Sequence, residues 1–265
     1  SYWKEWLKCQ YFIRRFDACL VGGRSHRDYL ELLGMPRQKI FLGYDVVDNQ
    51  YFVKEVARVR EQERALRLKH PEIPDAPYFL TVNRFIPRKN LLRLIRSYHG
   101  YLESAASEKV FHLVLCGGGV EESKLKSEVE KLGLSRHVHF PGFITYEDIP
   151  LWYAFAGAFV HPAIQEQWGL VVNEAAASGL PIISSSTVGA SAELVNHGSN
   201  GFEVNPLDEN EITNRLREMA NMDSTRRKMM GDSSAKTIEQ WSPKRFSDGL
   251  LAAVEIATGT SAKGK

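Results

Sequence analysis

The sequence predicts an α/β protein built on a doubly wound parallel sheet with helices on both faces. Two observations carry this prediction. From residue 78 onward, short apolar runs alternate with amphipathic segments of helical spacing, which is typical of parallel strands joined by helical crossovers. The chain has 265 residues, 43% of them hydrophobic and 25% charged, which suits one large domain or two small ones with a full core.

Each element follows from its local pattern. Five short apolar runs are predicted strands, at residues 78–83, 112–116, 138–140, 158–161 and 181–184. Apolar residues at helical spacing predict the helices between and after them, at residues 91–102, 121–132, 147–155, 170–178, 208–221, 224–238 and 243–257. Pro243 directly after Ser242 is a typical helix start.

The residues before the first strand follow a different pattern. Residues 58–70 have helical character, and the prolines at positions 71, 74 and 77 end it. Residues 3–15 combine aromatic and basic side chains in the manner of a basic amphipathic helix. Such a helix would lie on a membrane surface or a partner, or it would pack against a neighbouring element.

Composition and charge exclude several classes of protein. Lys plus Arg total 34 and Asp plus Glu total 32, so bulk charge gives no argument for a nucleic-acid partner. No apolar run reaches the roughly 18 residues of a membrane span. Cys9, Cys19 and Cys116 fit neither a disulfide framework nor a cysteine zinc site. No signal peptide opens the chain, so we expect a cytoplasmic protein, and Ser1 as first residue suggests a piece of a longer chain.

In a doubly wound sheet, ligands bind beyond the carboxyl ends of the strands, so the loops there are candidate sites. Arg84 and Lys89 follow the first strand at a junction with a helix, where basic side chains and free N–H groups attract phosphate. A solvated basic loop would have the same composition. Residues 117–119, all glycine, follow the second strand as a tight turn, with or without a ligand beside it. They are not the dinucleotide fingerprint, because Glu122 stands at its third glycine.

The loop after the fourth strand is the most informative one. Glu166 precedes a helix that Gly169 and Leu170 open, and Glu174 lies in the second turn of that helix. Backbone N–H groups at the helix start would face an anion, and carboxylates accept hydrogen bonds from sugar hydroxyls. A helix cap and a surface residue would account for the same two glutamates without a ligand.

Two further patterns are weaker. Residues 184–193 form a loop of small side chains that ends in an acidic residue, and this loop is either part of the site or a flexible connection. His137 and His139 share one face of a strand, as two metal ligands would. No third ligand is evident in the sequence, so the pair favours a structural or surface role.

Together these loops resemble one family, the group 1 retaining glycosyltransferases of the GT-B fold, which are relatives of glycogen synthases and bacterial mannosyltransferases. Glu166 and Glu174 match the E-x(7)-E signature of the family, with Trp168 and Gly169 as its aromatic-glycine pair. The sequence at 140–143, Phe-Pro-Gly-Phe, matches the segment that lies beside the nucleotide base in that family.

The resemblance covers nearly the whole chain. Arg84 and Lys89 match the R-x(4)-K diphosphate pair of the family, and residues 188–193 and 198–206 resemble two later segments in the right order. The implied fold is Rossmann-like, a single GT-B lobe with a remnant of the first lobe.

The resemblance implies that the complete enzyme transfers a sugar from a nucleotide-diphosphate sugar to an acceptor hydroxyl and retains the anomeric configuration. Donors of the UDP or GDP type are implied, without a cofactor or a metal ion. Arg84, Lys89 and the helix N-terminus at Gly169 and Leu170 would stabilise the leaving diphosphate. Glu174 would bind the ribose hydroxyls.

Glu166 is the catalytic candidate, because in this family it would hold hydroxyls of the donor sugar and orient the anomeric carbon. The backbone at Phe143 and Ile144 would hold the base. Gly117 and Trp168 complete the set of implied substrate-binding residues.

The sequence departs from the family pattern in two places. Ala190 and Ala192 replace the second glycine and the proline of the V-G-G-x-P-E loop, which bears on sugar preference. Asn83 stands where many relatives have glycine before the arginine.

The resemblance also predicts how the chain is divided. Residues 1–50 would be the remnant of an N-terminal acceptor lobe with its linker, 51–242 the donor-binding lobe, and 243–265 a crossover helix with a frayed tail. A glycan or glycoconjugate acceptor would bind mainly to the rest of the first lobe, so we expect the chain alone to be weakly active or inactive. The full enzyme would serve polysaccharide biosynthesis, with possible peripheral association at the inner membrane face.

Two other functions stay open at this point. The chain could be a non-catalytic module that binds nucleotide sugars and needs a separate acceptor subunit. It could also be another Rossmann-type protein, such as a nicotinamide-dependent enzyme, although the broken glycine fingerprint argues against this.

Overall fold

The structure, a computed structural model, describes residues 2–104 and 110–259 and divides into two compact units. The central unit is Asn49–Ile238, and the terminal unit combines Ser1–Asp48 with Glu239–Lys265. These borders differ slightly from the predicted ones at residues 50 and 242. The last long helix, which the sequence set apart as a segment of its own, groups with the N-terminal residues.

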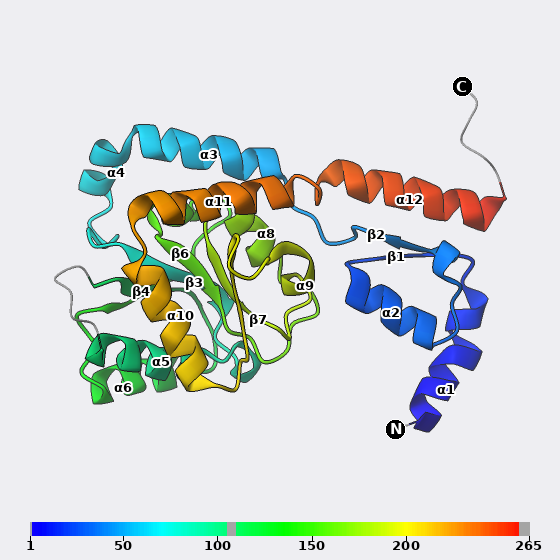
Figure 1. The fold of residues 1–265 in the computed structure, drawn as a ribbon, viewed down its shortest axis with the longest axis horizontal. Coiled ribbons are helices and arrows are strands. Elements are labelled where there is room, and N and C mark those ends of the chain that lie inside the picture. Colours follow the sequence, from blue (N-terminus) through cyan, green and yellow to red (C-terminus); the bar gives the residue numbers. More distant parts are fainter. Residues whose placement is uncertain (1, 105–109, 260–265) are drawn as a thin grey trace. The chain divides into compact units, whose positions relative to one another are not determined.

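The central unit contains a six-stranded sheet in the order β5-β4-β3-β6-β7-β8, in which every neighbouring pair is parallel (Figure 1). The strands are β3 (Tyr78–Arg84), β4 (His112–Gly118), β5 (Val138–Gly142), β6 (Ala158–His161), β7 (Ile182–Ser185) and β8 (Gly201–Val204). This sheet confirms the predicted fold class. The strand order reverses its direction between β3 and β6, and ligands bind at such a switch point in open α/β sheets.

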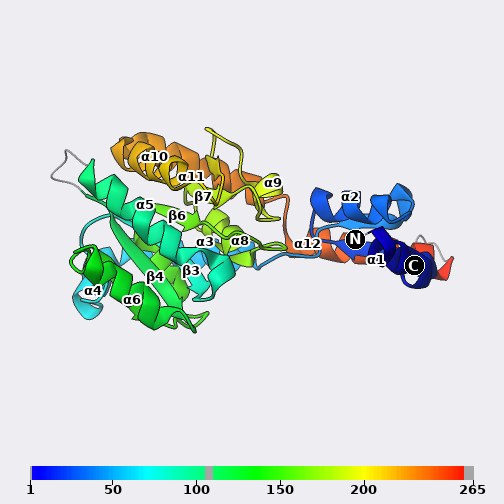
Figure 2. The ribbon, with the colours of Figure 1, turned by 90° about the horizontal axis from the view of Figure 1, so that it is seen from below.

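Helices cover both faces of the sheet, as Figures 1 and 2 show. One group of helices that pack against one another consists of α5 (Leu91–Glu103), α6 (Glu122–Lys131) and α10 (Glu209–Asn221). The other comprises α3 (Asn49–Glu61), α7 (Ile149–Phe155), α8 (Leu170–Ala177) and α11 (Ser224–Ile238). Three shorter elements complete the unit, namely α4 (Glu63–Lys69), η3 (Pro87–Lys89) and α9 (Ser191–Leu194).

The buried strand β3 shows why both faces must be covered. Its side chains alternate between the faces, because successive residues of a strand point to opposite sides. Phe79 packs on Tyr101 of α5 with ring centroids 5.8 Å apart, whereas the Tyr78 hydroxyl donates to the Trp152 carbonyl of α7 at 2.7 Å. Tyr78, Phe79 and Leu80 are all fully buried.

Two elements of the central unit were not predicted as they occur. Strand β8 lies within residues 198–206, which resemble a hairpin segment of the family, and a Cβ on its first residue, Gly201, would lie 1.9 Å from the Ile182 carbonyl oxygen. The helix expected at residues 58–70 occurs as two helices. The first, α3, already starts at Asn49 and ends at Glu61, and the second, α4, spans Glu63–Lys69. Phe52, Val56 and Val59 are the buried residues of α3.

The terminal unit has a small parallel sheet of β1 (Cys19–Val21) and β2 (Ile40–Leu42). Its helices are α1 (Tyr2–Tyr11), α2 (Arg24–Leu32) and α12 (Pro243–Thr258), with short 3-10 turns η1 (Ile13–Arg15) and η2 (Arg37–Lys39). Helix α12 packs on both strands. Strand β2 was not predicted. Within the described part of the chain, the helices are all too short or too polar to cross a membrane.

Candidate functional site

A pocket of about 290 Å³ opens at the carboxyl ends of β3 and β4, beside the switch point of the sheet. Five of the residues singled out from the sequence line it: Arg84, Lys89, Gly117, Phe143 and Ile144. The other lining residues are Val82, Asn83, Cys116, Gly118 and Val171. Loops far apart in the sequence therefore meet at the edge of the sheet where a ligand was expected.

Gly117 is required by the pairing of the strands as well as by the shape of the pocket. Its φ of +129° is a conformation that side chains rarely adopt, and an added Cβ would lie 1.8 Å from the Asn83 carbonyl oxygen. Gly119 is equally restricted, with a φ of +152° and the Phe85 carbonyl oxygen 2.6 Å from an added Cβ. The glycine turn thus has a structural reason that does not depend on a ligand.

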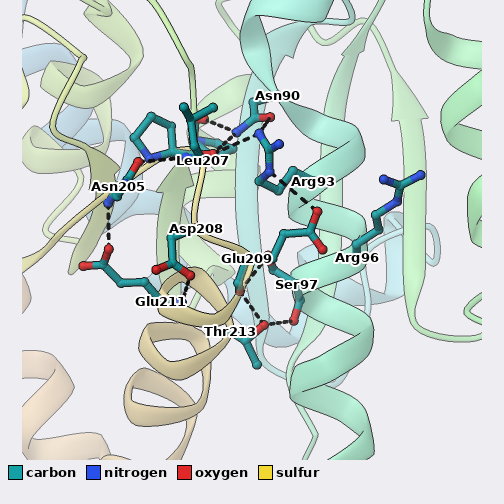
Figure 3. A network of polar contacts seen from close by, with 12 residues as sticks. Asn90, Arg93, Arg96, Ser97, Asn205, Leu207, Asp208, Glu209, Glu211 and Thr213 are labelled. Atoms are coloured by element: carbon teal, nitrogen blue, oxygen red, sulfur yellow. Dashed lines mark hydrogen bonds and ion pairs between the residues drawn. The ribbon is translucent and has the colours of Figure 1, made fainter.

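Asn90 directly follows Lys89, and Figure 3 shows its side chain within a network of polar contacts. It has a φ of +61°, a left-handed conformation that asparagine tolerates better than most residues. Its Nδ2 donates to the carbonyls of Pro162 at 3.0 Å and Pro206 at 2.7 Å, and its Oδ1 accepts from Arg93 at 2.8 Å. One side chain therefore connects the segments after β3, β6 and β8.

The two cations of the R-x(4)-K pair have different surroundings. Lys89 is buried, and its Nζ donates to Oε2 of Glu166 in an ion pair. Arg84 is exposed on the pocket wall, and no residue of the described ranges forms an ion pair or hydrogen bond with its side chain. Arg84 is accordingly the cation with its donors available to an anionic ligand.

His161 is a buried neighbour of this ion pair that the sequence analysis did not select. Its Nε2 lies 3.9 Å from Oε2 of Glu166, and neither ring nitrogen has a hydrogen-bond partner in the described structure. Burial, followed by the charge of Lys89, lowers the pKa of His161 to about 3. The imidazole is therefore neutral at physiological pH, and its contact with Glu166 is not a salt bridge.

The loop at 184–193 packs on the segment that carries Glu166. The Gly189 N–H donates to the Glu166 carbonyl at 3.1 Å, and the Ala190 N–H donates to the Trp168 carbonyl at 3.0 Å. A Cβ on Gly189 would lie 1.9 Å from the Gln167 carbonyl oxygen. These contacts hold the backbone of the segment that carries Glu166.

Helix α8 begins at Leu170, directly after Gly169, whose φ of +100° requires glycine. Leu170 is 41% exposed. Trp168 is instead buried, its Nε1 donates to Oδ1 of Asn173 at 2.9 Å, and it does not line the pocket. The structure thus places Trp168 in the interior, where it braces the start of α8.

Glu174 lies one helical turn after Val171, which lines the pocket, so both project from the same side of α8. The Tyr153 hydroxyl donates to its Oε2 at 2.8 Å. Burial raises the pKa of Glu174 to about 7, against the opposing effect of this hydrogen bond. Tyr153 was not predicted, because a buried aromatic residue in a helix gives no local sign of a polar contact 21 residues away.

Asn83 is a further lining residue that the sequence marked only as a departure from the family. Its Nδ2 donates to the Thr81 hydroxyl at 2.7 Å, and its buried Oδ1 has no partner in the described structure. Val171 and Cys116 line the pocket with apolar atoms, and no signal in the sequence distinguished them from ordinary core residues.

His139 on β5 and His137, which precedes the strand by one residue, belong to a larger cluster. Nδ1 of His112 lies 2.8 Å from Nε2 of His139, and the rings of His112 and His137 are 5.2 Å apart. Burial, followed by the charges of the other two histidines, lowers the pKa of His112 to about 4. In residues 2–104 and 110–259, no group of three or more His, Cys, Asp or Glu side chains is arranged to hold a metal ion.

The fold and the pocket define a doubly wound α/β protein with a pocket at its switch point that Arg84 and Lys89 line. A comparison with protein families matches residues 62–236 to the family described as glycosyl transferases group 1. The chain belongs to that family. This match confirms the resemblance stated from the loop motifs.

Individual relatives agree with this assignment. The chain is 29% identical to the sulfoquinovosyl transferase SQD2 of Arabidopsis thaliana over 240 residues, which are 89% of this chain and 44% of that protein. It is 31% identical to the O-antigen chain mannosyltransferase B of Escherichia coli over 150 residues, 56% of this chain and 38% of that protein. The chain therefore spans less than half the length of these two relatives.

Solved structures share the fold. Sucrose-phosphate synthase from Thermosynechococcus elongatus superposes with a TM-score of 0.76 at 22% identity, over 97% of this chain and 63% of that one. Anabaena Alr3699/HepE in complex with UDP and glucose superposes with a TM-score of 0.72 at 20% identity, over 98% of this chain and 67% of that one. At these identities the likeness is evidence of fold only.

Proposed function

We propose that this chain is the donor-binding part of a glycosyltransferase, which transfers a sugar from a nucleotide-diphosphate sugar to an acceptor hydroxyl with retention of the anomeric configuration. The observation that carries the proposal is the pocket at the switch point. It brings the exposed Arg84 and the buried Lys89 together with the glycine turn at Gly117 and the segment of Phe143 and Ile144. A pocket that is lined by cations and by the backbone of glycine residues suits a nucleoside diphosphate.

In this proposal the diphosphate binds against Arg84, with Lys89 and the N-terminus of α8 at Gly169 and Leu170 as further sources of positive potential. Guanidinium groups hold phosphate oxygens bidentately, and preorganised donors stabilise charge that develops on a leaving group. These groups would supply that stabilisation without a metal ion. The ion pair with Glu166 holds Lys89 in a fixed position before the ligand arrives.

The two glutamates take different parts in the proposal. Glu166 is the catalytic candidate and would hold hydroxyls of the donor sugar, so that its anomeric carbon faces the acceptor. Glu174 would accept hydrogen bonds from the ribose hydroxyls, with Tyr153 fixing its orientation. Trp168 would act on substrate binding indirectly, because its side chain braces α8 from the interior.

The base would lie at Phe143 and Ile144. Phe143 is 84% exposed at the rim of the pocket, and Ile144 is half-buried. UDP is supported by the Anabaena complexes, and GDP by a GDP-mannose-dependent mannosyltransferase of Mycobacterium tuberculosis, which is 27% identical over 189 residues. UDP and GDP donors are therefore the two to test.

The acceptor would be a glycan or glycoconjugate that binds mainly outside the central unit. The relatives are longer than this chain, and residues 1–50 would belong to an acceptor lobe with its linker. We therefore expect weak activity or none from the chain alone. Peripheral association of the full enzyme with a membrane surface is supported by four exposed aromatic side chains near the N-terminus, Trp3, Trp6, Tyr11 and Phe12. The inner membrane face and a role in polysaccharide biosynthesis are part of the proposal through the family resemblance alone.

A second candidate is a non-catalytic module that binds nucleotide sugars and works with a separate acceptor subunit. One observation favours it, namely that every lining residue of the donor pocket belongs to the central unit. Binding alone does not separate the two functions, whereas transfer to an added glycan acceptor by the full-length gene product does.

A thermal-shift screen of the chain against UDP, GDP, ADP and NAD tests the donor site. A ligand that binds only the folded state raises the unfolding midpoint as its concentration exceeds its dissociation constant. We expect a shift with UDP or GDP that Glu174→Ala abolishes. A shift with NAD alone would overturn the proposal, as would no shift with any of the four.

A further inference from the structure

A second pocket of about 390 Å³, here called the basal pocket, lies at the opposite ends of the strands from the donor pocket. Gly157 and Pro181, which line it, directly precede β6 and β7, so the pocket opens at the amino ends of these strands. The donor pocket instead follows the carboxyl ends of β3 and β4. All residues of this basal pocket belong to the central unit.

The charged side chains that line the basal pocket are mostly cationic. Arg60, Arg227 and Lys228 supply three positive charges, and Asp232 is the one carboxylate among the lining residues. Lys228 and Asp232 form an exposed ion pair at 2.7 Å, one turn apart on α11. Because solvent screens exposed ion pairs, they contribute little to the free energy of folding, and this pair can be broken at little cost.

Arg60 is held rigidly at the pocket. Its Nε donates to the Ala154 carbonyl at 3.1 Å and its Nη2 to the Ser178 carbonyl at 3.3 Å, so it caps the carboxyl ends of α7 and α8. No residue within the described ranges accepts a hydrogen bond from its Nη1. Desolvation by burial lowers the pKa of Arg60, against the charges of Asp232 and Glu63.

Arg227 is held in a similar way. Its Nη1 donates to carbonyls at the end of α10, those of Met219 at 3.5 Å, Ala220 at 3.4 Å and Met222, and its guanidinium lies 5.0 Å from the Phe111 ring centroid. Its Nε and Nη2 donate to no acceptor that the structure describes. Burial lowers the pKa of Arg227 as well, against the charge of Asp223.

The start of α11 contributes little to this positive potential. Ser224 is the first residue of this 15-residue helix and lines the pocket. Asp223, directly before it, accepts a hydrogen bond from the Arg226 N–H at 2.8 Å, so its carboxylate offsets the partial positive charge of the helix macrodipole. An anion in the pocket would therefore meet mainly two guanidinium groups and an ammonium group.

We propose that the basal pocket is a second anion site, separate from the donor pocket, which binds a small molecule that carries a phosphate group. Rigid guanidinium groups with unused N–H donors favour phosphate oxygens, which they bind bidentately. The pocket is larger than the donor pocket, so a sugar phosphate fits its volume better than inorganic phosphate alone. The proposal does not depend on which donor, if any, the first pocket binds.

Calorimetric titration with inorganic phosphate and with ribose 5-phosphate tests the proposal. The titrations use the Arg84→Ala chain, so that phosphate binding at the donor pocket is weakened. Lys228→Glu reverses one pocket charge, and Lys236→Glu makes the same change on an exposed residue of the same helix outside the pocket. Asp232→Asn removes the competing carboxylate.

We expect both phosphates to bind, ribose 5-phosphate more tightly. Lys228→Glu should weaken binding about fivefold or more, since a charge reversal acts over a short distance. Asp232→Asn should strengthen binding, and Lys236→Glu should leave it within about twofold, because screening attenuates charges beyond about 10 Å. Thermal unfolding of each variant confirms that it is folded.

Three results would overturn the proposal. The first is absence of phosphate binding to the Arg84→Ala chain. The second is equal weakening by Lys228→Glu and Lys236→Glu, which would mean general surface attraction. The third is binding to vesicles of phosphatidylcholine and phosphatidylglycerol without binding of either soluble phosphate, which would mean a membrane-facing patch rather than a pocket for a free ligand.

Discussion

Glu174 is a partly buried residue whose carboxyl group the proposed function requires in its ionised form. Burial favours the protonated form and raises the pKa to about 7, while the hydrogen bond from Tyr153 favours the ionised one. At neutral pH the group is therefore near its midpoint. A bound ribose would draw it toward the carboxylate.

The pH dependence of stability tests this environment. Because the pKa of Glu174 is raised on folding, the folded chain binds its proton more tightly than the unfolded chain does. The stability from this proton is present below the ordinary pKa and is lost as pH rises through about 7. Glu174→Gln should remove that loss, which amounts to about 3 kcal/mol. Urea unfolding of the unmodified chain and of Glu174→Gln at about pH 5 and pH 8 measures this loss of stability. If the stability of both proteins changed with pH in the same way, Glu174 would not be the source of the pH dependence.

Asn90 combines an unusual backbone conformation with three side-chain hydrogen bonds. Asn90→Ala should destabilise the chain by about 3 kcal/mol for two reasons. The Pro162 carbonyl loses its donor and the Pro206 carbonyl keeps only Arg93 at 3.2 Å. In addition, alanine must adopt a positive φ without the local hydrogen bonds that asparagine makes. Asn90→Gly should cost about 1 kcal/mol less, since glycine adopts this φ freely. Urea denaturation compares the three proteins, and equal losses for both variants would contradict the assigned backbone strain.

Among the secondary-structure elements, the paired ends of β3 and β4 connect fold and site most directly. Gly117→Ala should push the two strands apart, since its Cβ would lie 1.8 Å from the Asn83 carbonyl oxygen. We expect a loss of more than about 3 kcal/mol of stability and of nucleotide binding.

Gly133→Ala is the matched control for that substitution. Gly133 also has positive φ, at +69°, but nothing lies within 4 Å of an added Cβ. Its replacement should cost about 1 kcal/mol and leave nucleotide binding unchanged. Thermal unfolding with and without UDP distinguishes the two sites, and similar losses at both would mean that φ rather than the close strand contact matters.

Most elements of the central unit were predictable because their patterns are local. The five predicted strands are short apolar runs, and the helices between them repeat apolar residues at helical spacing. Strand β8 is four residues long and begins with a glycine that only its approach to Ile182 explains, so no local pattern indicates it. Strand β2 is three residues long and is equally hard to recognise.

The site was predictable to the level of loops but not of contacts. A doubly wound sheet brings the loops after β3, β4 and β5 together, and the pocket there contains the residues chosen from them. The ion pair of Lys89 with Glu166 joins residues 77 positions apart, and the hydrogen bond of Tyr153 to Glu174 joins two helices. Such pairs depend on packing, which spacing in the sequence does not encode.

At the scale of the whole molecule, the division into two units makes a direct prediction. Every lining residue of the donor pocket lies in the central unit. A chain of residues 49–238 should therefore fold and bind the same nucleoside diphosphate with an affinity within about threefold of the longer chain. Circular dichroism and calorimetry check this, and loss of binding by a folded central unit would mean that the terminal unit contributes to the site.

Arg84 is the available cation of the proposed nucleotide site. Calorimetric titration of UDP and GDP into the chain and into Arg84→Ala tests it most directly, with Arg88→Ala as control. Arg88 is an exposed arginine of the same loop and does not line the pocket. We predict that one nucleotide binds, that Arg84→Ala weakens it tenfold or more, about 1.4 kcal/mol, and that Arg88→Ala does not. Equal affinities for all three proteins, or no binding to any, would contradict the account.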